Sequence, residues 1–163
     1  MQYTSIKKEE WDKHLENMLT SHTIFASVIN EFGQDYELIR PVDIPLISYN
    51  KPKPATSLKS FFLPIKENVT SERSAEKPRI IIGTPNCDIE GLSLLDEIYL
   101  DEVFTDIHYR ERRENTLLIS SDCFGIQEHC HCMTYGIKPY STKNADLAVI
   151  NFDGNLIFRI ISG

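Results

Sequence analysis

Three cysteines and two histidines lie within ten residues of one another in the last third of the chain. They are Cys123, His129, Cys130, His131 and Cys132. Thiolate and imidazole groups are ligands of zinc, of other transition metals and of iron–sulfur clusters. A segment this polar is a poor environment for thiols that are merely buried, so the group of donors predicts a bound metal or iron–sulfur cluster.

The fourth cysteine, Cys87, lies upstream, in the turn after the apolar run 78–83. Asp88 is suited to cap a helix that follows this turn. At a helix N-terminus the dipole and the free amides favour a thiolate over a thiol, and the thiolate is the form that binds a metal. The candidate ligands are therefore Cys87, Cys123, Cys130 and Cys132, with His129 and His131 as substitutes if Cys87 is too distant.

The spacing of the cysteines does not choose the metal. It matches neither the paired C-x2-C knuckles of zinc ribbons nor the cysteine run of bacterial ferredoxins, and four cysteines suit both a tetrahedral zinc ion and a 4Fe-4S cluster. Two other chemistries compete. Cys123 or Cys130 could act as a nucleophile with a histidine (His108, His129 or His131) as base, but such catalysis needs one activated thiol rather than a group of them. Two disulfides are disfavoured by a reducing compartment.

The hydrophobic pattern predicts the elements that position these residues. We expect a helix over about 5–20 capped by Ser5, a hairpin over 23–29 and 36–39, a strand at 78–83, helices after Asp88 and over 105–113, a strand at 116–120, and a closing hairpin over 145–152 and 156–161. Strands 78–83 and 116–120 each end just before a cysteine. If they are neighbours in one sheet, Cys87 and Cys123 emerge at the same edge.

Prolines divide the segment 41–54, which we expect to be an extended connection because proline removes backbone donors and restricts the residue before it. The apolar segment Leu58–Pro64 should pin that connection to the core. The predicted fold is an α/β (mixed α+β) domain over residues 1–163, with a central mixed sheet, about three helices, an N-terminal helix and terminal β-hairpins.

Composition excludes several classes of function. The chain has 163 residues, 41% hydrophobic and 25% charged, and a formal net charge of -7. This charge disfavours binding to nucleic acid. No apolar run approaches the ~20 residues of a membrane-spanning helix, so no membrane insertion is expected. The first residues lack the pattern of a secretory signal, which predicts a cytoplasmic location.

An ordered series of segments resembles a family of electron-transfer subunits. The segments are Lys59–Pro64, Ile82–Asp88, Tyr109–Arg113, Cys123, Cys130–Met133 and Ala145–Leu147. Together they are similar to the N-terminal region of the beta subunits of cytoplasmic NiFe sulfhydrogenases and of the corresponding iron–sulfur subunit of anaerobic sulfite reductase. His131 departs from the family, where the middle residue of the Cys-x-Cys motif is usually aromatic.

The resemblance implies a domain of an iron–sulfur electron-transfer subunit, working within a hydrogenase-like or sulfite-reductase-like complex. It implies a 4Fe-4S cluster, with zinc as the alternative, held by the four cysteines. It also implies that the partners are the other redox subunits and a ferredoxin-like C-terminal region, and that this domain alone performs no catalysis. The alternative is a structural or docking module that binds zinc or no metal.

Overall fold

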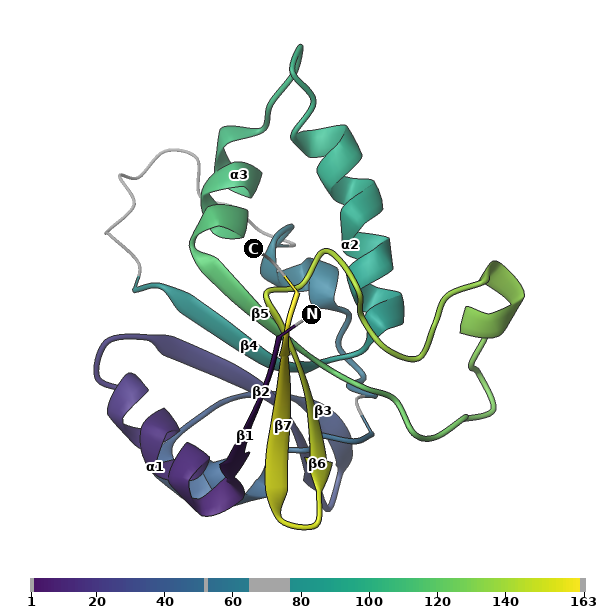
Figure 1. The fold of residues 1–163 in the computed structure, drawn as a ribbon. Helices are drawn as coiled ribbons and strands as arrows, with labels where there is room; N and C mark the ends of the chain where they lie inside the picture. The colour runs from purple at the N-terminus through teal and green to yellow at the C-terminus, as the bar shows by residue number, and fades with distance from the viewer. Residues whose placement is uncertain (1, 52, 65–76, 162–163) are drawn as a thin grey trace.

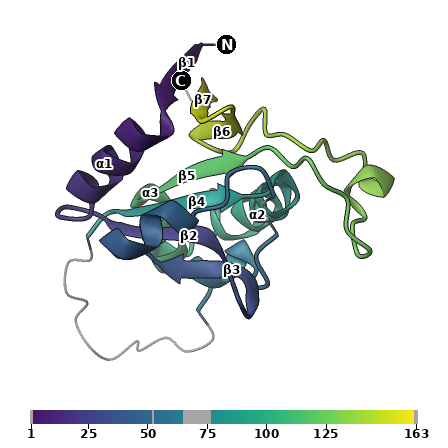
Figure 2. The same ribbon diagram turned by 90° about the horizontal axis from the view of Figure 1, so that it is seen from below.

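The computed structural model describes residues 2–51, 53–64 and 77–161, which are organised around one seven-stranded mixed sheet (Figures 1 and 2). The strand order is β1-β7-β6-β5-β4-β2-β3. The strands are β1 (Tyr3–Lys7), β2 (Thr23–Asn30), β3 (Gly33–Leu38), β4 (Arg79–Thr84), β5 (Thr116–Ser121), β6 (Leu147–Phe152) and β7 (Asn155–Ile160). The described residues also form the α-helices α1 (Lys8–Met18), α2 (Asn86–Tyr99) and α3 (Ile107–Glu114). The predicted α/β class, with a mixed sheet and three helices, is confirmed.

Helices cover both faces of the sheet. On one face, Leu15 of α1 packs in a core that includes Ile80 of β4. On the other face, Leu92 of α2 and Tyr109 of α3 pack in a core that includes Ile81. Successive side chains of a strand point to opposite faces, so both sides of β4 are buried and its centre, Ile80–Ile82, is apolar. Among the described residues, no helix is long and apolar enough to cross a membrane.

Both predicted hairpins are confirmed. β2 pairs antiparallel with β3, and β6 pairs antiparallel with β7. In the second hairpin the turn residues Asp153 and Gly154 both have positive φ, at 50° and 74°. A type I′ turn requires positive φ at both central residues, and an Asp-Gly pair adopts this conformation readily.

The predicted start of the first helix is wrong. Ser5 does not cap a helix, because it lies in β1, where it pairs with Ile157 of β7. α1 begins only at Lys8, and the residue before it, Lys7, makes no side-chain capping bond. The available edge of β7 provides backbone partners for residues 3–7, and this distant pairing overrides the local helix signal.

The segment 41–54 also departs from the expected extended connection, because Pro41–Leu46 forms a 3₁₀ helix. Its first turn is closed by reciprocal bonds, in which the Arg40 amide donates to Asp43 Oδ2 at 3.0 Å and the Asp43 amide donates to the Arg40 carbonyl at 2.9 Å. A proline in the first turn of a helix removes no hydrogen bond. The expected pinning of the connection is confirmed, since Leu58 and Phe62 are buried.

Candidate metal centre

Two neighbouring parallel strands carry Cys87 and Cys123 to one edge of the sheet. β4 pairs in parallel with β5, which confirms that the two strands are adjacent (Figure 1). Cys87 follows β4 by three residues, and Cys123 follows β5 by two. The carboxyl ends of adjacent parallel strands lie side by side, which is where open α/β sheets bind their ligands.

At Gly83, near the end of β4, the backbone bends and leads the chain toward α2. Gly83 has φ 86°, and a Cβ added there would lie 2.8 Å from Cβ of Ser27. Glycine adopts this conformation without steric cost, and it alone leaves room for β2. The register of β4 against β5 shifts between Ile82 and Thr84, so the strand ends in an irregularity that leads directly into the helix.

Cys87 lies in the first turn of α2, as predicted, but Asp88 is not the cap. Pro85 occupies the capping position, and it makes no side-chain hydrogen bond there. Asp88 instead accepts a hydrogen bond from the Leu58 amide, with 3.3 Å between N and Oδ2. This bond ties the start of α2 to the segment that pins the long connection to the core.

The other three cysteines belong to a long loop between β5 and β6 that projects away from the sheet (Figure 2). Arg159 of β7 holds both ends of this loop. Its Nη2 donates to Asp122 Oδ1 at 3.2 Å and to the Ser141 carbonyl at 2.8 Å. The two ends also meet directly, since the Cys123 amide donates to the Pro139 carbonyl at 2.8 Å. The base of the loop is therefore closed.

Within the loop, backbone hydrogen bonds hold Cys130, and one of them reaches its thiol. The Gln127 amide donates to Cys130 Sγ at 3.2 Å, and the Cys130 amide donates to the Gln127 carbonyl at 3.0 Å. The following residues form a 3₁₀ helix, Cys132–Tyr135, which ends at Gly136 with φ 68°. An amide that donates to a sulfur is the contact that stabilises a thiolate or a metal-bound sulfur.

All four cysteines line a single cavity of about 560 Å³. Each cysteine is partly buried and has a free thiol, so the structure does not contain the two disulfides of the alternative. The rest of the lining is largely apolar and includes Phe124, Ile126, Met133 and Ile137. His129 and His131 are both among the described residues, and neither lines this cavity.

Asn86 and Lys53 add polar groups to the same cavity. Asn86 Nδ2 donates to the Lys138 carbonyl at 2.9 Å, which joins α2 to the loop. Its buried Oδ1 has no hydrogen-bond partner in the described part of the chain. A buried acceptor without a partner costs free energy and is uncommon in a folded protein, so it marks a place where a further group fits.

The cavity shifts the acidity of its thiols in opposite directions. Burial, followed by the charge of Asp88, raises the pKa of Cys87 to about 11. The expected thiolate at this helix N-terminus is therefore wrong for the metal-free protein, because burial outweighs the charge of Lys53 and the backbone hydrogen bond from Asp88 that lower the pKa. By contrast, the hydrogen bond from Gln127, followed by one from Lys53, lowers the pKa of Cys130. A metal would supply the charge that stabilises Cys87 as a thiolate.

Sequence reasoning missed both Lys53 and Asn86. Lys53 is 34 residues from the nearest cysteine in sequence, and a lysine between two prolines carries no ligand pattern. Asn86 lies next to Cys87 and could have been noticed as a polar residue in the same turn. No sequence signal, however, indicated that one of its side-chain atoms would be buried without a partner.

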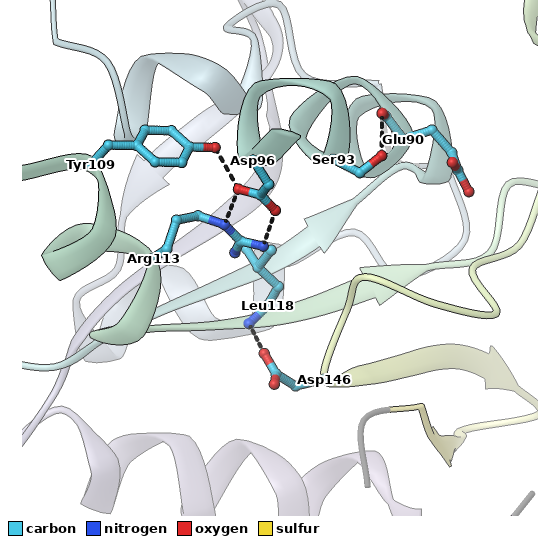
Figure 3. Close-up of polar contacts among 7 residues, drawn as sticks. All are labelled: Glu90, Ser93, Asp96, Tyr109, Arg113, Leu118 and Asp146. Carbon is cyan, nitrogen blue, oxygen red and sulfur yellow. Dashed lines mark hydrogen bonds and ion pairs between the residues drawn. The ribbon is translucent and has the colours of Figure 1, made fainter. Parts of the chain in front are cut away.

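The far end of α2 is fixed by a network of a different kind (Figure 3). Asp96 of α2 accepts two hydrogen bonds from Arg113 of α3, both at 2.8 Å, and a third from the Tyr109 hydroxyl at 2.6 Å. The Arg113 guanidinium also lies 5.3 Å from the ring centroid of Phe62. Next to this network, Asp146 accepts a bond from the Leu118 amide at 2.8 Å. α2 is thus held at one end by charge pairing while its other end carries Cys87.

The fold and the cavity together describe an α/β chain in which two cysteines at the carboxyl ends of parallel strands and two from the following loop line one cavity. Among the described residues, no group of three or more His, Cys, Asp or Glu side chains is arranged to hold a metal ion. In sequence it is 24% identical over 162 residues to sulfhydrogenase 2 subunit beta of Pyrococcus furiosus, a distant homology. The match covers 94% of this chain and 44% of the relative, so the chain spans less than half of the relative's length. No family model matches the chain. No solved structure matches it either.

Proposed function

We propose that this chain is an iron–sulfur electron-transfer domain of a hydrogenase-like or sulfite-reductase-like complex, and that Cys87, Cys123, Cys130 and Cys132 bind its cluster. The observation that carries the proposal is that all four cysteines line one cavity although they come from separate parts of the chain. Such a cluster supplies one-electron chemistry. The protein's residues hold it, shield it from water and place it near a partner.

The four cysteines are a donor set that suits either a tetrahedral zinc ion or a 4Fe-4S cluster. Around one zinc ion, thiolates at 2.3 Å from the metal lie about 3.8 Å from each other. In a 4Fe-4S cluster each cysteine binds a different iron, so the four thiolates stand around a volume rather than a point.

The distant homology supports the assignment to a complex. The relative's name describes it as the beta subunit of a sulfhydrogenase, which is a multi-subunit enzyme by that description. We infer that this chain likewise works beside other redox subunits, and that it corresponds to the N-terminal domain of a longer electron-transfer subunit with a ferredoxin-like C-terminal region. In this assignment the chain moves electrons and makes or breaks no substrate bond.

A docking module that binds zinc or no metal is the second candidate. The observation that favours it is the exposure of large apolar side chains on the cysteine loop, namely Phe124, Ile126, Met133 and Tyr135, which are 66%, 83%, 81% and 78% exposed. Exposed apolar side chains grouped in this way are typical of surfaces that contact another protein. The two candidates differ in whether the four thiols bind iron.

Anaerobic reconstitution of the purified chain with ferrous iron and sulfide tests the proposal. We expect a brown protein with broad visible absorption and iron bound in a fixed ratio to protein. Separate Cys87→Ser, Cys123→Ser, Cys130→Ser and Cys132→Ser variants should each lose most of this iron. The variant at Cys87 is the most informative, because this residue is the one that comes from outside the loop.

His129→Ala and His131→Ala serve as matched controls in the same loop. Neither histidine lines the cavity, so both variants should keep the iron content and the absorption of the wild type. A wild-type protein that stays colourless and iron-free would overturn the iron–sulfur proposal. Uptake of one zinc per chain by that protein would favour the docking module instead.

A further inference from the structure

We infer that Lys53 is a positioning residue for charge at this site: its ammonium group offsets the negative charge of the cluster and sets the reduction potential. This inference rests on the proposed function. It assigns a role to a residue outside the cysteine segments, on a part of the chain that carries no ligand.

Lys53 lines the cavity together with all four cysteines. The side chain of Lys53 is partly buried. A lysine side chain ends in an ammonium group. The wall of the cavity therefore combines a positive charge with the four cysteines that would bind the cluster.

Hydrogen bonds hold the chain in place before Lys53. Asn50 exchanges two bonds with Asn151 of β6, with Nδ2 to the Asn151 carbonyl at 2.7 Å and the Asn151 amide to Asn50 Oδ1 at 2.8 Å. The Asn50 carbonyl also accepts a bond from the Phe124 amide at 3.2 Å, which ties this segment to the cysteine loop. Next to it, the Lys51 carbonyl accepts a bond from Gln34 Nε2.

The chain is fastened equally after Lys53. The Ala55 amide donates to the Gln34 carbonyl at 3.0 Å. Asp35 accepts bonds from the Thr56 amide at 2.8 Å and from the Thr56 hydroxyl at 2.9 Å. Both flanks of Lys53 are thus bound to the edge strand β3, and the backbone that carries the ammonium group is fixed against the cavity.

A fixed positive charge beside a cluster changes the balance between its two redox states. The reduced cluster carries one more negative charge than the oxidised cluster, so a neighbouring cation stabilises the reduced state more. Lys53 should therefore raise the reduction potential.

The test compares Lys53→Met and Lys53→Arg with the wild type after anaerobic reconstitution, using a redox titration with dithionite followed by electron paramagnetic resonance. Lys53→Met should keep its iron and shift to a more negative midpoint potential. Lys53→Arg retains the positive charge and should stay close to the wild type. Lys51→Met is the matched control, since Lys51 is exposed in the same segment and does not line the cavity.

Each outcome decides between the hypotheses. If Lys53→Met retains iron with an unchanged potential, the inference about Lys53 is wrong while the cluster stands. If Lys53→Met loses iron but Lys53→Arg keeps it, the positive charge is needed to assemble the cluster, which supports the inference. Loss of iron from both variants would overturn a role based on charge. A wild type that takes up no iron overturns the proposed function, and the inference with it.

Discussion

The two ends of α2 are built in opposite ways. At its C-terminal end, Asp96 uses both carboxylate oxygens on Arg113 and Tyr109, and the partners come from the chain itself (Figure 3). At its N-terminal end, Cys87 faces a cavity with three other free thiols, and Asn86 has a buried acceptor without a partner among the described residues.

The C-terminal end of α2 is therefore a site that stabilises the fold, whereas the N-terminal end is a site suited to bind a ligand. Polar groups that satisfy one another within the chain contribute to folding and leave nothing for another molecule. Donor atoms gathered around an open volume contribute little to folding until something binds there. The same helix carries both sites, with Asp96 near its C-terminal end and Cys87 in its first turn.

Arg113→Met should cause the largest loss of stability. The substitution keeps apolar bulk beside Phe62 but leaves the Asp96 carboxylate, which is largely buried, with Tyr109 as its remaining partner in this network. We expect the free energy of unfolding to fall by about 2 kcal/mol, because a mostly buried charge loses two hydrogen bonds. Urea denaturation of the metal-free protein measures the change.

Arg110→Met provides the control on the same helix. Arg110 lies 4.0 Å from Glu114, and both side chains are about half exposed or more, at 49% and 70%. Exposed pairs of this kind contribute about 0.5 kcal/mol or less. Equal losses in the two variants would show that the Asp96 network has no special part in stability.

Local sequence patterns were sufficient to predict most of the fold. Short apolar runs predict the strands β4 and β5, and the pair Asp153-Gly154 predicts a hairpin turn, in each case from the local residues alone. The adjacency of β4 and β5 was also predictable, because strands that follow one another along the chain are usually neighbours in the sheet. That adjacency brings Cys87 to the same edge as Cys123.

Long-range pairing explains what the sequence did not predict. Ser5 lies in a strand only because β7, some 150 residues later in the chain, offers an edge to pair with. The acidity of Cys87 depends on how deeply the folded chain buries it, and its spacing in sequence carries no such information. The neighbours of Lys53 hold its segment in place through bonds to Asn151, Gln34 and Asp35, none of which is near it in sequence.

Asp35→Asn should have a smaller, pH-dependent effect on the segment that carries Lys53. Burial acts to raise the pKa of Asp35, but hydrogen bonds from Thr56 and Tyr36 outweigh it and lower the pKa. A lowered pKa in the folded state stabilises the fold above the unfolded pKa, near 4, and the benefit is lost as pH falls through the folded value. We expect a loss of about 1 kcal/mol at pH 6.

Urea denaturation at pH 6 and pH 3 checks this sign. The difference between wild type and Asp35→Asn should be largest at pH 6 and should shrink toward pH 3, as the pH falls below the unfolded pKa and toward the lowered folded pKa. Thr56→Val, which removes the hydroxyl donor and leaves the amide, should show a part of the same pattern. If the difference instead grows toward low pH, the Asp35 carboxylate does not hold the segment that carries Lys53.

Cys132→Ala should have the smallest effect on the stability of the metal-free protein. This result would contrast most strongly with that of Arg113→Met. Cys132 is partly exposed beside an open cavity, so its loss should change the free energy of unfolding by about 0.5 kcal/mol or less. After anaerobic reconstitution the comparison should reverse. A ligand that binds only the folded state stabilises it, so iron and sulfide should raise the urea midpoint of the wild type and leave that of Cys132→Ala unchanged. A large loss in the metal-free variant would mean that the thiols are packing residues after all, and that the two ends of α2 serve the same purpose.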